Sequence, residues 1–337
     1  MQLTKYFLKR IGASVFVLFG VSIVIFLIAR AIPGDPARMA LGPRASPEMV
    51  EQLRERLHLN DSIPAQYFYF LRGVSEGDLG MSLYTKRPVV QDLAEYFPAT
   101  FELVIFAGLI MVVVGIPLGI LSARHQDRLT DNVARIFALL GVVTPTFVWA
   151  IFFMLIFAYI LDLLPIMGRL SEEVLAPPDV TGMYTFDALL AGQWHTFKDA
   201  LIHIIMPAGA LALSGLGQAA RLTRTNMLDS FSRPYSEMAR AYNFSELQTS
   251  MKYALRPAMI PTLTILGLDF AVMLGNAFLV EKVFAWGGLA QYGVEAIFYK
   301  DLNAIVGTVL VIALFFLVVN MIIDLVVAYL NPRIRLG

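Results

Sequence analysis

The chain has 337 residues, of which 58% are hydrophobic and only 15% charged, and its mean hydropathy is +0.68. Ordinary soluble domains carry roughly 25% charged residues, so this composition excludes a soluble globular protein and predicts one that contacts membrane lipid. The 26 basic residues balance the 26 acidic ones, and cysteine is absent. We expect no nucleic-acid partner, and the redox compartment stays open.

Six apolar runs are long enough to cross a bilayer, which takes about 20 residues per helix. Their apolarity is uniform rather than alternating, which predicts helices instead of strands. The first run follows Lys9 and Arg10 as a signal peptide would, but it is long enough to span and lacks small residues for cleavage, so we expect a retained helix. The runs lie near residues 10–30, 100–122, 135–161, 201–220, 261–281 and 304–330.

The distribution of Lys and Arg predicts the orientation. Fourteen of the 26 fall in residues 1–10, 122–135, 221–256 and 331–337. Short basic loops stay in the cytoplasm, so both termini are predicted to face the cytoplasm. Residues 162–200 hold six acidic and two basic residues. This external segment is an acidic mouth that favours cationic groups on a solute, or its charge simply follows from the topology.

A second external segment covers residues 33–99. Ser46 as N-cap, Pro47 at the first helical position and apolar residues at helical spacing predict a helix that ends near Leu57. This helix lies on the membrane or on neighbouring loops, or it offers a docking face to an external partner.

Two features of the apolar runs concern packing and bending. Gly115 and Gly119 are four residues apart, a spacing that predicts close approach of a neighbouring helix. Pro145 interrupts the third run and predicts a kink there.

A polar, basic insert at residues 235–261 separates two apolar runs. Pro234 suits the first turn of a short helix that continues to about Tyr242. Asn243 follows it, and Asn accepts the left-handed conformation at a helix C-terminus. The pattern predicts a helix that stops at a turn on Asn243.

The second half of the insert begins with Ser245-Glu-Leu-Gln248, which matches a capping box. The helix that it opens is expected to end near Arg256, before Pro257 and Pro261. A cytoplasmic helix–turn–helix of this kind is a docking element for another protein, or a loop that folds back on its own bundle.

Asp269 lies within the run 262–280, where an acidic side chain costs roughly 2.5–3.5 kcal/mol on insertion scales. Asn276 lies nearly two helical turns further on and shares its face. We expect the two to line a solute path; the alternative is a buried hydrogen bond to a partner helix.

Several catalytic and nucleotide-binding motifs are absent. None of the 24 glycines is followed by lysine, so the phosphate-binding motif GxxxxGK[ST] does not occur, and neither do HExxH or GxSxG. The chain is expected to bind no ATP in the P-loop manner and no metal. A powered transporter of this kind needs a separate ATPase chain, for which the cytoplasmic insert is the expected docking place.

The insert resembles the EAA loop of ABC importer permeases, in which Glu-Ala-Ala is followed after three residues by Gly and later by Leu and Pro. Glu237, Ala239 and Asn243 occupy the Glu, second Ala and Gly positions. Residues 239–244 and 254–261 resemble the dipeptide and oligopeptide branch more closely, although Tyr242 stands where that branch has Lys and Asn243 where it has Gly.

Other segments of the chain resemble the same branch, in the first of its two related permease subunits. They are Ile32-Pro-Gly-Asp-Pro36, Gly77-Asp-Leu-Gly80, Pro98-Ala-Thr-Phe-Glu-Leu103, Gly115-Ile-Pro-Leu-Gly119, Arg221-Leu-Thr-Arg224, Met227-Leu228 and Asn331-Pro-Arg-Ile-Arg335.

The resemblance implies an all-α integral membrane protein with the type I ABC importer transmembrane fold, six transmembrane helices and both termini cytoplasmic. It implies an N-terminal helix and long periplasmic segment at 1–93, a transmembrane core at 94–330 and a cytoplasmic tail at 331–337. The EAA coupling loop lies at 221–261. Its candidate ATPase-coupling residues are Glu237, Ala239, Arg240, Ala241, Tyr242, Asn243, Leu255 and Arg256.

The implied function is that of a permease subunit, not itself an enzyme, of an ATP-driven importer in a bacterial or archaeal inner membrane. It would form the path for di- and oligopeptides or similar small solutes that a periplasmic or lipid-anchored binding protein delivers. Its implied partners are a second homologous permease subunit and two ATP-binding subunits, which hold ATP and Mg; this chain binds no cofactor. The alternative is an ion-coupled secondary transporter or channel that uses Asp269, and a membrane-embedded enzyme is a third possibility.

Overall fold

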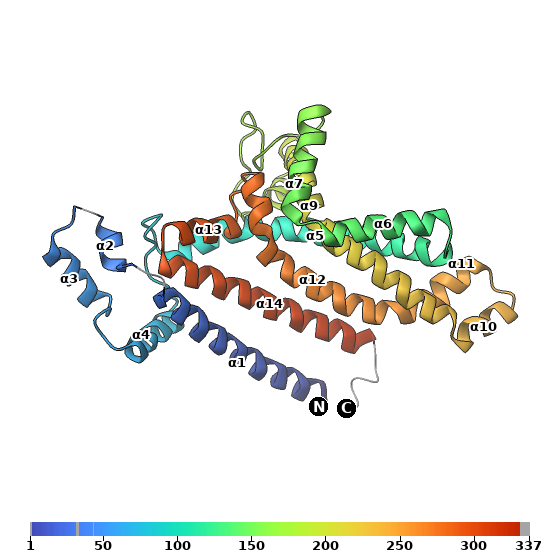
Figure 1. Ribbon diagram of the computed structural model, residues 1–337, viewed down its shortest axis with the longest axis horizontal. Helices are drawn as coiled ribbons and strands as arrows, with labels where there is room; N and C mark the ends of the chain where they lie inside the picture. The colour runs from blue at the N-terminus through green and yellow to red at the C-terminus, as the bar shows by residue number, and fades with distance from the viewer. Residues whose placement is uncertain (1, 32–33, 43, 331–337) are drawn as a thin grey trace. The chain divides into compact units, whose positions relative to one another are not determined.

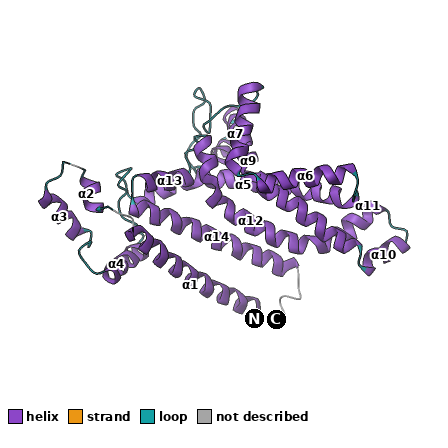
Figure 2. Ribbon diagram, viewed as in Figure 1, coloured by secondary structure: helices purple, strands orange, loops and turns teal. Residues whose placement is uncertain are grey.

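The computed structural model describes residues 2–31, 34–42 and 44–330, and in this part of the chain the secondary structure is helical (Figure 2). No β-strand occurs among the described residues, where Met81 and Pro88 form one isolated bridge. The predicted all-helical class is therefore confirmed. The tail at 331–337 lies outside the described residues, as do Ile32 and Pro33 of the first short motif.

The chain divides into two compact units, one of residues 4–99 and 287–315 and the other of residues 1–3, 100–286 and 316–337. Figure 1 labels the helices in chain order. They are α1 (Gln2–Ala31), α2 (Pro36–Leu41), α3 (Pro47–Arg56), α4 (Ile63–Glu76), α5 (Val89–Arg124), α6 (Leu129–Val143), α7 (Thr146–Phe153), the π-helix η1 (Met154–Ile160), α8 (Tyr184–Leu190), α9 (Trp194–Phe231), α10 (Pro234–Ala241), α11 (Glu246–Gln248), the π-helix η2 (Thr249–Ala254), α12 (Leu255–Val283), α13 (Leu289–Phe298) and α14 (Leu302–Leu330).

Five helical segments of the described chain are long and apolar enough to span a membrane, and the number rises to six if one bent pair forms a single span. The bent pair is 129–143 with 146–160, and its two halves meet at 110°. Pro145 lies at this break as the N-cap of α7. Its ring leaves no backbone N–H to donate and disfavours a helical conformation of the residue before it, so the helix is interrupted there. The predicted kink is confirmed, and the six spans and the cytoplasmic termini remain predictions.

Within the smaller unit, short helices follow α1. Ser46 caps α3 by accepting a hydrogen bond from the Met49 N–H at 3.3 Å, which confirms the predicted helix start. Asp35 caps α2 and forms a 2.8 Å ion pair with Arg54 of α3. Burial raises the pKa of Asp35, but the hydrogen bonds from Arg54 and the Ala37 N–H outweigh it, so this pKa lies below its usual value.

The larger unit is built around α9, which packs against α6, α7, α8 and α12. Small residues bring α5 close to α9. A Cβ atom built on Gly115 would lie 2.6 Å from the Ala219 Cβ, and one on Gly119 would lie 2.5 Å from the Thr223 Cβ. The predicted close helix approach at this glycine pair is confirmed.

The acidic segment after η1 is held by its own carboxylates. Asp187 accepts hydrogen bonds from the backbone N–H groups of Thr181 and Gly182 at 2.9 Å, and Asp199 accepts one from Ser171 at 2.8 Å. These contacts give two of its six acidic residues a structural role. They favour the interpretation in which the acidic charge of the segment follows from the topology, over an acidic mouth for cationic solutes.

Buried Glu102 of α5 ties the same segment to the membrane helix. It forms a 2.7 Å ion pair with Arg169 and accepts a hydrogen bond from the Thr185 N–H at 2.7 Å. The Arg169 guanidinium lies 3.7 Å from the centre of the Tyr184 ring. These contacts hold the segment after η1 in place against α5.

Candidate functional site

The polar insert folds as α10, α11 and η2, beside the C-terminal end of α9 (Figure 1). Pro234 opens α10 in its first turn, as predicted. Ser236 and Ala239 turn inward and are buried, and the Ser236 hydroxyl donates to the Ser230 carbonyl at 2.7 Å. One face of α10 is thereby fixed on α9, which bears out part of the alternative in which the loop folds back on its own bundle.

The turn after α10 has the hydrogen bonds of a Schellman motif. Asn243 adopts a left-handed conformation with φ of 60°. Its N–H donates to the Arg240 carbonyl at 2.9 Å, and the Phe244 N–H donates to the Ala239 carbonyl at 3.2 Å. The predicted helix stop at Asn243 is confirmed.

The second arm begins with the predicted capping box. The Gln248 N–H donates to the Ser245 hydroxyl at 3.2 Å, and the Ser245 N–H donates to the Gln248 side chain at 3.1 Å. The predicted end of this arm near Arg256 is wrong, because η2 continues directly into α12.

The π-helical register explains why the proline after Arg256 does not end the helix. Proline in a helix lacks a donor and its ring clashes with the carbonyl four residues earlier. In η2 the bonds shift to five residues, as in the Leu255 N–H to Ser250 carbonyl contact. Pro257 follows this five-residue bond, and the helix continues through it into α12.

A small apolar cluster fixes the end of η2. Ala254 and Ala258 are buried against Ala123 of α5 and Met227 of α9, and Leu255 packs on them. The candidate coupling residues therefore divide into two groups. Ala239 and Leu255 anchor the loop, whereas the others lie on its surface: Glu237, Arg240, Ala241, Tyr242, Asn243 and Arg256.

The surface of the loop carries large apolar side chains. Of these, only Tyr242 was among the residues predicted from the sequence. Tyr242 is 74% exposed and Met238, one turn earlier on α10, is 57% exposed. Leu247 and Met251, one turn apart on the second arm, are 55% and 46% exposed. We call these four residues the docking patch. Apolar residues four apart within a polar insert are the sequence signal that would have found them.

The loop that carries the docking patch also exposes charged residues. Arg240 forms a 3.4 Å ion pair with Glu246 across the turn, and its guanidinium lies 5.7 Å from the centre of the Phe231 ring. Glu237 and Arg256 are exposed. An exposed apolar patch with a charged rim is typical of a protein–protein interface.

The two candidate path residues lie on α12. Asp269 is partly buried, and its Oδ2 atom has no hydrogen-bond partner within the described structure. Asn276 is exposed. A buried carboxylate oxygen without a partner is costly in an apolar setting, which keeps Asp269 a candidate for contact with solute or with another subunit.

The sequence profile of the "binding-protein-dependent transport system inner membrane component" matches residues 115–336, and the profile of the N-terminal part of such components matches residues 3–104. The chain belongs to this family. Three proteins illustrate the similarity of this permease to known ones. The probable D,D-dipeptide transport system permease protein of Escherichia coli K12 is 40% identical over 329 residues, which cover 98% of this chain and 97% of the relative.

The other two proteins are less similar to this chain in sequence. The dipeptide transport system permease protein of Alkalihalophilus pseudofirmus is 36% identical over 332 residues, which cover 98% of this chain and 99% of the relative. A solved structure titled as inward-facing conformations of the MetNI methionine ABC transporter matches 69% of this chain and 94% of its own, with 16% identity and a TM-score of 0.49.

Family membership assigns this permease to the ATP-driven importers of bacterial inner membranes, as a transport subunit and not an enzyme. It has the type I transmembrane fold of that family and works with ATPase and solute-binding partners. An ion-coupled transporter or channel is not favoured. No cluster of three or more candidate metal ligands occurs among the described residues.

Proposed function

We propose that this permease forms half of the path through which an ATP-driven importer carries di- and oligopeptides. The peptide class is supported by the two similar permeases, which are named for dipeptide and D,D-dipeptide transport and match nearly the whole chain. A second, homologous permease subunit forms the other half. Two ATP-binding subunits hold ATP and Mg, and an external binding protein delivers the peptide. Residues 1–93 form the N-terminal helix and periplasmic segment, and residues 94–330 form the core.

The docking patch is the observation that carries this proposal. Its four large apolar side chains are exposed on a loop whose backbone is fixed by buried Ser236, by Ala239 and by the cluster at Ala254. Exposed apolar residues on a fixed scaffold suit a stable partner surface, since little conformational freedom is lost on binding. The partner is the ATPase, because the chain contains no nucleotide-binding motif of its own.

Asp269 and Asn276 are proposed to face the peptide path on α12. Their spacing of seven residues places them nearly two turns apart on one helix. The unpartnered Oδ2 of Asp269 supports a contact with the peptide or with the second permease subunit. A carboxylate there suits the ammonium group of a peptide, which would offset the cost of its burial.

The experiment replaces Tyr242 and Leu247 together by Ser, in the chain co-expressed with its ATPases, the second permease subunit and the binding protein. Loss of two buried apolar contacts of about 2 kcal/mol each weakens ATPase binding by more than a hundredfold, since each 1.4 kcal/mol is tenfold. Co-purification of the ATPases and uptake of a labelled dipeptide into vesicles are measured.

Leu129→Ser provides the matched control, because Leu129 is 78% exposed at the start of α6, outside the docking patch. Both permease variants must reach the membrane in equal amounts. ATPases that co-purify fully with the double variant contradict the docking proposal. Absence of dipeptide uptake by the unmodified complex contradicts the peptide assignment, whatever the variants do.

A further inference from the structure

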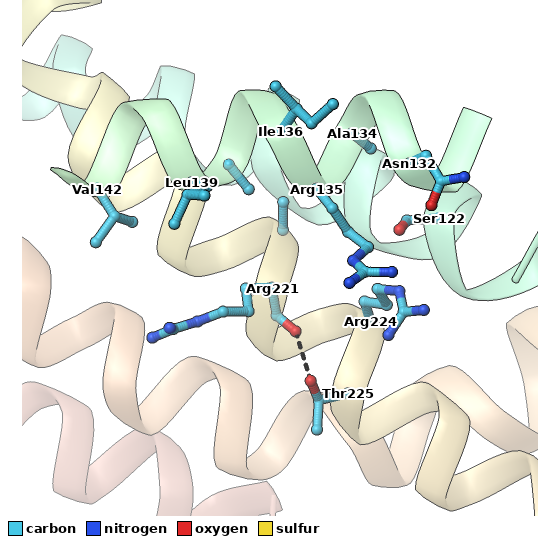
Figure 3. Close-up of a pocket in the computed structure, with 12 residues that line it drawn as sticks. Ser122, Asn132, Ala134, Arg135, Ile136, Leu139, Val142, Arg221, Arg224 and Thr225 are labelled. Atoms are coloured by element: carbon cyan, nitrogen blue, oxygen red, sulfur yellow. Dashed lines mark hydrogen bonds between the residues drawn. The ribbon is translucent and has the colours of Figure 1, made fainter. Parts of the chain in front are cut away.

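A cavity of about 490 Å³ lies between α6 and α9, with Ser122 of α5 on its border (Figure 3). Three arginines line it, Arg135 from α6 and both Arg221 and Arg224 from α9. None of its twelve lining residues is Asp or Glu. In Figure 3 the side chains of Arg135 and Arg224 reach toward the same part of the cavity from opposite helices. The cavity therefore presents a cationic lining at one end.

The three arginines differ in how far their charge is compensated. Arg224 forms two 2.7 Å hydrogen bonds with buried Asp131, one to each carboxylate oxygen. Arg221 donates to the neutral Gln218 amide oxygen at 2.6 Å. Arg135 makes no ion pair or hydrogen bond within the described residues. Arg135 thus offers its charge to an outside ligand, whereas the Arg221 side chain points away from that end of the cavity in Figure 3.

The cationic end lies at the edge of the apolar part of the chain. The third apolar run begins at Arg135, and the fourth ends immediately before Arg221. α9 has 38 residues and is about 57 Å long, whereas the hydrocarbon core is about 30 Å thick, so α9 must extend beyond the core. The start of an apolar run at Arg135 thus puts this residue at the level where hydrocarbon meets lipid headgroups.

The rest of the cavity is apolar. Ile136, Leu139 and Val142 line it from α6 and remain exposed. At Gly217 the two helices are in tight contact, because a Cβ atom there would lie 2.4 Å from the Ala138 carbonyl oxygen. One ligand chemistry matches this arrangement: an anion attached to an apolar chain.

We propose that this cavity binds an anionic phospholipid, whose phosphate contacts Arg135 at the end that Arg135 shares with Arg224 and whose acyl chain lies along Ile136, Leu139 and Val142. Guanidinium groups match phosphate geometry with paired N–H donors. Basic pockets between membrane helices at the cytoplasmic surface are a recurrent setting for anionic headgroups. The lipid stabilises the packing of α6 on α9 just before the chain enters the loop at 234–254.

The test uses the permease purified from membranes with the subunits that co-purify. It is incubated with equal amounts of phosphatidylglycerol and phosphatidylcholine that carry the same acyl chains, and retained lipid is counted by native mass spectrometry. The unmodified chain retains phosphatidylglycerol in preference. Arg135→Gln reduces that retention about fivefold, since it removes an arginine from beside the anionic headgroup.

Two further variants separate charge from geometry. Arg233→Gln is the matched control, because Arg233 is exposed, pairs with Asp229 at 2.9 Å and lies outside the cavity; retention stays unchanged. Arg135→Lys keeps the charge but not the paired donors, and its loss is smaller than that of Arg135→Gln. Because Arg135 has no ion pair to break, its variants are expected to fold normally, and they decide the outcome.

Three results would overturn the proposal. The first is equal retention of both lipids by the unmodified chain, or no loss in the Arg135 variants. The second is displacement of phosphatidylglycerol by excess inorganic phosphate, which would identify a site for free phosphate. The third is displacement by a free dipeptide, which would place the cavity on the peptide path. Persistence of bound phosphatidylglycerol against both competitors supports the lipid site.

Discussion

The left-handed turn at Asn243 offers the sharpest test of how the loop is held. Its φ of 60° costs an ordinary L-residue roughly 1–2 kcal/mol, and Asn tolerates it better because its short polar side chain bonds locally. Asn243→Ala is therefore expected to destabilise the turn by about 1 kcal/mol, which is a fivefold shift toward its open form. Asn243→Gly leaves the turn intact, since Gly adopts this conformation without a steric penalty.

Hydrogen exchange measures that shift directly. The Phe244 N–H is bonded to the Ala239 carbonyl only while the Schellman turn is closed. In the purified complex, its exchange rate should rise about fivefold in Asn243→Ala and stay near the unmodified value in Asn243→Gly. Dipeptide uptake at equal expression should fall in the Ala variant and persist in the Gly variant.

The pair of variants isolates the backbone effect, because both remove the Asn side chain. Equal exchange of the Phe244 amide in the two variants would refute the reasoning, since it would show that the left-handed conformation does not limit the turn. Equal loss of uptake in both would instead assign the effect to the Asn side chain, and a contact with the ATPase would have to replace the turn as its explanation.

Two further predictions concern the membrane helices. Gly217→Ala places a Cβ atom against the Ala138 carbonyl oxygen, so α6 and α9 must separate at a cost of about 1–3 kcal/mol. The melting temperature of the detergent-solubilised permease should therefore fall. Gly12→Ala is the control, because nothing lies within 4 Å of that Cβ position, and its melting temperature should not fall. Asp269→Asn should change the uptake rate or the dipeptide preference at unchanged expression, because it removes the charge of a partly buried carboxylate. Unaltered uptake rates and an unaltered dipeptide preference would exclude Asp269 from the peptide path.

Local features of the loop were predictable because their causes lie within a few residues. The capping box at Ser245, the stop at Asn243 and the start at Pro234 each depend on side-chain and backbone groups three or four positions apart. The break at Pro145 belongs to the same class, since proline acts on its own turn. Such signals are readable from one sequence.

Contacts between distant segments were not predictable from one sequence. Asp131 and Arg224 are 93 residues apart, and Glu102 and Arg169 are 67 apart, so no periodicity relates them. Nor does any local motif predict the π-helix η2, which packs against α9. The failure to foresee it led to the wrong prediction that the second arm ends near Arg256.

The continuity of η2 with α12 changes how the loop should be viewed as a mechanical element. A second helix that ended at Arg256 would leave a flexible joint between the docking patch and the membrane. Instead, Leu247 and Met251 stand on a helical segment that leads without interruption into α12, the helix that carries Asp269. The first arm is joined to α9 by the short link of Ser232 and Arg233 and by the Ser236–Ser230 hydrogen bond.

α9 and α12 also pack against each other along the core of the larger unit. If an ATPase binds the docking patch as proposed, its displacement reaches both helices through rigid connections, and little of it is absorbed in the loop. Rigid elements with two discrete arrangements are what a gating transition requires. The buried anchors Ala239 and Ala254 therefore matter as much for coupling as the exposed residues that touch the partner, because they keep the two arms from moving independently.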